Sequence, residues 1–144
     1  YEYALQHQAS GCKIIMGGAS SSSNAGIYQA ALELADQGKT IYTTGLSIDQ
    51  TTEENPYILG GLLKNTNICT RNVVENYLNG TIEGGSQLLG LKENAFGVVY
   101  ITTDKENYRN TDIITDEVIA AGKEAADKII SGELVIEVPE EAAH

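Results

Sequence analysis

Gly17 and Gly18 end a short apolar run and open a segment with four consecutive serines, residues 20–23, that leads into a helical pattern. Paired glycines let backbone N–H groups approach a ligand closely, and serine hydroxyls and the first turn of a helix add hydrogen-bond donors. These residue types favour a site for a polar ligand. They suit equally a loop that only caps the helix.

Two common phosphate-binding motifs do not fit this loop. A Walker loop needs a lysine directly after its last glycine, whereas Ile27 follows Gly26. Residues 17–22 miss the third glycine of the dinucleotide fingerprint, and residues 45–47 include no acidic side chain where that motif has one. The loop therefore matches neither motif.

The elements that would hold the loop follow a strand–helix–strand order. The pattern predicts a strand over Lys13–Met16, a helix capped by Ser22, Ser23 or Asn24 and ended by Gly38, and a strand over Thr40–Thr44. This order with short connections is typical of a parallel sheet. Ligands of such sheets bind beyond the carboxyl ends of the strands. The glycine–serine loop and the segment after Thr44 are therefore expected to open on one crevice.

The remaining pattern predicts further elements of a single α/β unit. A first helix is expected to stop at Gly11, and Pro56 favours a loop over residues 45–61. Two more helices are predicted, Asn67–Asn79 and Glu117–Ser131, the second capped by Thr115 or Asp116. Three more strands are predicted over residues 86–91, 96–103 and 133–139. Residues 86–91 lack clean alternation, which favours burial on both faces.

Composition limits the classes of function. The 144 residues form one domain or one continuous piece of a larger one. The formal net charge of -11 argues against a nucleic-acid partner, because no basic stripe is present to neutralise phosphates. The first residues carry no signal peptide pattern. Because the chain begins within a helical pattern, we expect a fragment, although a short natural domain fits as well.

Four stretches resemble the basic membrane protein family in their order and spacing. They are IIMGGASSSSNAGIYQAA, IYTTGLSIDQ, YILGGLLKNTN and LGLKENAFGVV. Members of that family are lipid-anchored substrate-binding proteins of ABC transporters, similar to receptors for purine nucleosides. The resemblance covers nearly all of the chain and corresponds to the second half of a typical member.

This resemblance implies a type I periplasmic-binding-protein-like fold, with a mostly parallel sheet flanked by helices. Residues 1–144 would be the C-terminal half of a two-lobe protein that closes on its solute by hinge motion. The implied function is binding of a nucleoside or similar small polar solute, with no chemistry and no cofactor. The implied partners are that solute and an ABC transporter permease. The full-length protein would be extracytoplasmic and lipid-anchored to a bacterial membrane.

The family motifs assign ligand contacts to five residues. The backbone of Gly17 and Gly18 would approach the ligand, and Ser47 takes the position of an aspartate that resembles a ribose-hydroxyl acceptor. Asp49 matches the later aspartate of the same turn, and Lys64 matches a lysine that can donate to hydroxyl or base oxygens. On residue type alone, Asp49 also fits a turn residue and Lys64 a solvated surface lysine.

Departures from the family motifs bear on the ligand. A hydroxyl at Ser47 is a weaker partner for ribose than a carboxylate, and Gly60 and Gly61 replace a threonine–serine pair near the lysine. The aromatic groups that stack on a nucleobase belong mainly to the other half of the family. These departures favour an alternative function, a diverged ligand sensor or interaction domain of the same fold.

No metal site or catalytic site is expected. His7 and His144 lack companions at ligand spacing, and residues 104–117 lack the central glycine of a calcium loop. Cys12 and Cys69 are expected as buried free thiols, with no cue that links either to a base. The prediction is therefore a protein that is not an enzyme.

A half-family chain would expose the surface that its other lobe covers. Exposed apolar patches tend to bind partners. We therefore expect a homo-oligomer, a dimer or larger, and exchange of an element between copies is one route to it.

Overall fold

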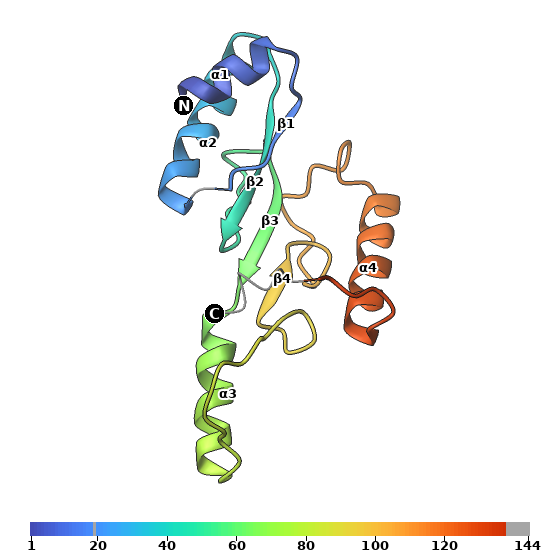
Figure 1. The fold of residues 1–144 in the computed structure, drawn as a ribbon. Helices are drawn as coiled ribbons and strands as arrows, with labels where there is room; N and C mark the ends of the chain where they lie inside the picture. Colours follow the sequence, from blue (N-terminus) through green and yellow to red (C-terminus); the bar gives the residue numbers. More distant parts are fainter. Residues whose placement is uncertain (19, 138–144) are drawn as a thin grey trace.

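The computed structural model describes residues 1–18 and 20–137 of the chain, and Figure 1 shows their arrangement. Within these residues helices and strands alternate along most of the chain. In order they are α1 Glu2–Ala9, β1 Ile14–Ile15, α2 Ser21–Asp36, β2 Tyr42–Ser47, β3 Ile58–Lys64, α3 Thr66–Leu78, β4 Phe96–Val98 and α4 Asp116–Ser131. The predicted α/β class is confirmed.

The strands form one sheet in the order β1-β2-β3-β4. The first three strands are parallel, and β4 runs antiparallel to β3. Figure 1 shows α1 and α2 together on one side of this sheet, α4 on the other, and α3 extending beyond the end of β3. The predicted mostly parallel sheet with flanking helices is therefore confirmed.

The buried core lies between α2 and the sheet. Ala31 and Leu34 of α2 pack with Ile41, which directly precedes β2, and all three are buried. The spacing of three residues in α2 places both apolar side chains on the helix face that meets the sheet. Leu5 of α1 and Tyr57 pack around this cluster. The core thus fixes the β1–α2–β2 unit that carries the glycine–serine loop.

The N-cap of α2 differs from the prediction. Ser20, and not Ser22, Ser23 or Asn24, is the cap, and its hydroxyl accepts a hydrogen bond from the Ser23 N–H at 3.2 Å. Ser20 keeps an extended backbone, with φ -143° and ψ 162°, whereas the following serines already belong to the first turn. Asn24 is buried, and its side chain donates a hydrogen bond to the Gly17 carbonyl oxygen in the preceding loop.

The prediction of a loop over residues 45–61 is wrong at both ends and correct for residues 48–57, which lie between two strands. β2 continues to Ser47 and β3 begins at Ile58. Gly60 and Gly61 interrupt the apolar run of β3, and glycine has a low strand propensity, which concealed the strand in the sequence. Pairing on both sides, with β2 and β4, stabilises it. β3 thus lies inside the sheet and brings Lys64 to the end of a strand.

Three predicted strands near the C-terminal half are wrong in part or in full. Residues 86–91 form no strand, and Leu88 is 84% exposed instead of buried. Of residues 96–103 only Phe96–Val98 are a strand, because Tyr100 turns the chain with φ +67°. Residues 133–137 form no strand, and 138–139 lie outside the described residues. Apolar runs form strands only where a neighbouring strand accepts their hydrogen bonds.

The last two helices match the sequence pattern closely. The hydroxyl of Thr115 caps α4 by accepting from the Val118 N–H at 3.4 Å, and Gly132 ends the helix with φ +80°.

α3 has no buried residue along its length, and four of its apolar side chains are 49–75% exposed: Val73, Val74, Tyr77 and Leu78. Among the described residues, no helix is long and apolar enough to cross a membrane.

Candidate functional site

The carboxyl ends of three parallel strands define the candidate site. Ser47, the last residue of β2, pairs with Leu63, and Lys64 ends β3 one residue later. Gly17 and Gly18 follow β1, which pairs with β2 in the same direction. The structure therefore brings the glycine loop, Ser47 and Lys64 to one edge of the sheet, the position at which open parallel sheets bind ligands.

The two glycines of the loop differ in what surrounds them. The Asn24 side chain, which is 1% exposed, donates from Nδ2 to the Gly17 carbonyl oxygen at 3.2 Å. A Cβ atom at Gly17 would lie 2.3 Å from Asn24 Oδ1, whereas nothing lies within 4 Å of the corresponding position at Gly18. Gly17 is needed for packing against α2. The exposed Gly18 is the one whose backbone is open to a ligand.

This difference predicts unequal effects of alanine at the two positions. Gly17→Ala should lower the free energy of unfolding by about 1–3 kcal/mol, because the buried Asn24 has to move. Gly18→Ala should change it by less than about 0.5 kcal/mol. Urea unfolding followed by circular dichroism measures both variants. Equal stability of the two would contradict the packing role assigned to Gly17.

The turn after β2 is tied to α2 through Gln50. Its Oε1 atom accepts from the Leu46 N–H at 2.9 Å and from the Tyr28 hydroxyl at 2.7 Å. Burial raises the pKa of Tyr28, so the phenol stays protonated and donates. Ser47 adopts φ +72°, a conformation that is uncommon for a residue with a side chain. These contacts hold Ser47 in that conformation at the edge of the site.

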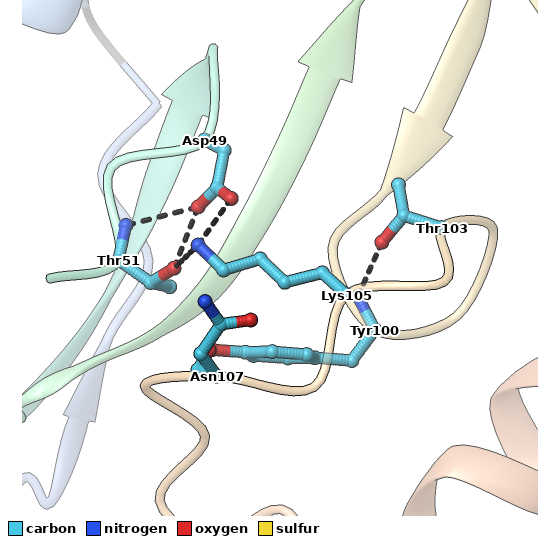
Figure 2. A network of polar contacts seen from close by, with 6 residues as sticks. All are labelled: Asp49, Thr51, Tyr100, Thr103, Lys105 and Asn107. Atoms are coloured by element: carbon cyan, nitrogen blue, oxygen red, sulfur yellow. Dashed lines mark hydrogen bonds and ion pairs between the residues drawn. The ribbon is translucent and has the colours of Figure 1, made fainter.

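Asp49 closes the same turn and pairs with Lys105. Its Oδ1 atom accepts from the Thr51 N–H at 3.0 Å and from the Thr51 hydroxyl at 2.7 Å, and Oδ2 lies 2.6 Å from Lys105 Nζ. Burial alone raises the pKa of Asp49, but the hydrogen bonds from Lys105 and Thr51 outweigh it and hold the pKa below its ordinary value. Figure 2 shows the three side chains pointing toward one another.

Lys64 ends β3, and the glycine pair of the same strand lies next to β2. The Lys64 side chain is exposed, and its backbone pairs with Phe96 of β4. A Cβ atom at Gly61 would lie 2.5 Å from the Gly45 carbonyl oxygen of β2. The glycine that replaces a family hydroxyl is therefore required by the close approach of the two strands.

Several functional contacts were not visible in the sequence. Lys105 stands in a run of polar residues that matches no motif, 54 positions or more from its partners Asp49 and Thr51. The expectation of a buried thiol is wrong for Cys12, which is exposed because it follows the turn after α1 instead of entering the core. The other thiol, Cys69, is partly buried. Across residues 1–18 and 20–137, no group of three or more histidine, cysteine or acidic side chains is placed to hold a metal ion.

The fold is shared with solute-binding proteins of ABC transporters. A crystal structure of such a protein from Aeropyrum pernix K1 superposes with a TM-score of 0.70 over 96% of this chain and 44% of that chain, at 20% identity. A transcriptional activator of the comK gene from Bacillus halodurans superposes with a TM-score of 0.71 over 94% of this chain and 43% of that chain, at 15% identity. At these identities the likeness establishes the fold.

Sequence similarity connects the chain with basic membrane proteins. Basic membrane protein C of Borreliella burgdorferi, in strains N40 and ATCC 35210, is 31% identical over 113 residues, which is 77% of this chain. The resemblance recognised from the four motifs is thereby confirmed. The match spans 29% of the length of these relatives, so this chain corresponds to part of such a protein. No protein-family model matches the chain.

Proposed function

We propose that this chain contributes one wall of the binding site of an ABC-transporter solute-binding protein, and that the solute is a nucleoside or a similar small polar molecule. The observation that carries the proposal is the convergence of Gly18, Ser47 and Lys64 at the carboxyl edge of the parallel sheet. A backbone N–H, a hydroxyl and an ammonium group suit the hydroxyl and carbonyl oxygens of such a solute.

Gly17 and Asp49 belong to the same proposed site with supporting roles. Gly17 lets the loop pack against Asn24, which places the Gly18 backbone at the edge. Both carboxylate oxygens of Asp49 already accept hydrogen bonds within the protein, so the residue acts on the solute through the turn that carries Ser47. The proposal includes no catalytic step.

The proposed binding cycle needs a second lobe. Residues 1–144 would be the C-terminal half of a receptor whose two lobes close on the solute, and the missing lobe would supply aromatic stacking on a base. The full-length protein would be extracytoplasmic, lipid-anchored to a bacterial membrane and coupled to a transporter permease. The exposed apolar side chains of α3 support contact with another lobe or another chain, and for the isolated chain we propose a homo-oligomer.

A diverged sensor or interaction domain is the second candidate. Ser47 stands where the family motif has a carboxylate, which favours loss of the family's solute. The unburied α3 is equally suited to a protein partner. This candidate predicts the same assembly as the first, but no bound nucleoside.

Native mass spectrometry of the gently desalted chain, followed by titration with nucleosides, separates the two candidates. We expect an assembly larger than a monomer and weak binding of inosine or guanosine, measured to millimolar concentration because one lobe provides only part of the contacts. Lys64→Met should weaken this binding by about tenfold, since a hydrogen bond to a charged group is lost, while the matched control Lys92→Met should not. Assembly without any nucleoside binding would support the second candidate.

A further inference from the structure

The segment between β4 and α4 reaches the turn of the candidate site through Lys105. This segment, residues 100–108, is folded on itself. The Tyr100 N–H donates to the Thr103 hydroxyl, and the Tyr100 hydroxyl donates to the Asn107 carbonyl oxygen, each at 3.1 Å. Tyr100 is buried and therefore anchors the segment. Figure 2 shows the Lys105 side chain extending from it toward Asp49 and Thr51.

The Lys105 ammonium group contacts both ends of the turn at once. Nζ donates to Asp49 Oδ2 and to the Thr51 hydroxyl, each at 2.6 Å. It also lies 5.1 Å from the ring centre of Tyr108, within the range of a cation–π contact. The Lys105 and Asp49 side chains are 20% and 31% exposed, so water screens this ion pair less than a pair on the open surface.

These contacts leave the turn held from two sides. Gln50 joins it to Tyr28 of α2, and Lys105 joins it to residues 100–108. Ser47, the last residue of β2, directly precedes this turn and has an uncommon left-handed conformation. A conformation of this kind is unfavourable for a residue with a side chain and persists only where its surroundings enforce it. Ser47 therefore adjoins a turn that is attached to the protein on both sides.

We propose that Lys105 is a positioning residue of the solute site: its ion pair with Asp49 and its hydrogen bond to Thr51 hold the turn that presents Ser47 to the solute. This inference rests on the proposed function and deepens it. Lys105 does not touch the solute. It acts through Asp49, whose carboxylate oxygens accept hydrogen bonds from Lys105 and Thr51 within the protein.

Amide hydrogen exchange of the solute-free chain tests the attachment itself. Lys105→Met should speed exchange of the Thr51 amide, which donates to Asp49, by about tenfold, the factor expected for loss of one charge-assisted contact. Lys105→Arg should restore slow exchange, and the control Lys123→Met, which removes an exposed charge from α4, should leave it unchanged. Unaltered exchange over residues 46–52 in Lys105→Met would overturn the proposal.

Titration with inosine tests the effect on the site. Lys105→Met should weaken inosine binding by about tenfold while the midpoint of thermal unfolding stays close to that of the parent chain, and Lys105→Arg should recover most of the affinity. Faster exchange with unchanged affinity would overturn the positioning role and leave the proposed function standing. If the parent chain itself binds no inosine, the proposed function and the positioning role both fail, while the exchange result still decides whether the attachment exists.

Discussion

Gly61→Ala is expected to lower the free energy of unfolding by about 3 kcal/mol, at the upper end of the cost of overpacking. A Cβ atom at this position would lie 2.5 Å from the Gly45 carbonyl oxygen, 2.6 Å from its carbonyl carbon and 2.7 Å from its Cα atom. All three are backbone atoms of β2, directly opposite Gly61 in the register. They cannot rotate away as a side chain would, so the two strands must separate or shift.

Chemical denaturation followed by far-ultraviolet circular dichroism measures this effect. Gly84→Ala is the matched control, since nothing lies within 4 Å of a Cβ atom there and its φ is not positive. The control should stay within about 0.5 kcal/mol of the parent chain. A Gly61→Ala variant as stable as the control would show that β2 and β3 do not approach as closely as the structure has them.

Ile41→Ala is the second substitution with a large expected effect, about 3 kcal/mol of destabilisation. Ile41 is fully buried against Ala31 and Leu34 of α2. Truncation removes apolar surface from the contact between α2 and the sheet and leaves a cavity that the flanking backbone cannot close completely. Because this contact holds the β1–α2–β2 unit, the loss should appear as global unfolding at lower denaturant.

The same unfolding experiment on Ile136→Ala provides the control. Ile136 is 61% exposed in the segment after α4, so its truncation should change stability by less than about 0.5 kcal/mol. A comparable loss in both variants would contradict the assignment of the core to the α2 face of the sheet. Because both variants truncate an isoleucine to alanine, a difference in their loss of stability reports the burial of Ile41 and not the type of residue removed.

Gly61 also bears on how this chain departs from the family motifs that it resembles. Gly60 and Gly61 replace a threonine–serine pair of the family motif, which by sequence reads as two hydroxyls lost from the site. In the structure Gly61 is required by its neighbour Gly45, so the change is part of how β2 and β3 pack. The absence of a side chain at Gly61 is then a consequence of strand packing, and the proposed site keeps the partly buried Ser47 and the exposed Lys64 as polar groups.

Local patterns of the sequence determined the class of fold and the arrangement of the loops that carry the proposed site. The apolar run at Lys13–Met16, the helical period of α2 and the Thr40–Thr44 run are short-range signals, and they predict a parallel strand–helix–strand unit. From that unit alone it follows that the loop after β1 and the turn after β2 share one edge. Both ends of α4 were also predicted, because caps and glycine stops are local features.

Only the tertiary structure decided which apolar runs become strands and which polar side chains meet. β3 was concealed by its two glycines and exists because β2 and β4 pair with it, while residues 86–91, which also carry several leucines, form no strand. Lys105 reaches Asp49 across 56 positions of sequence. Strand pairing and ion pairs of this kind depend on residues far apart in the chain, whose approach is set by packing of the whole sheet and leaves no local pattern in the sequence.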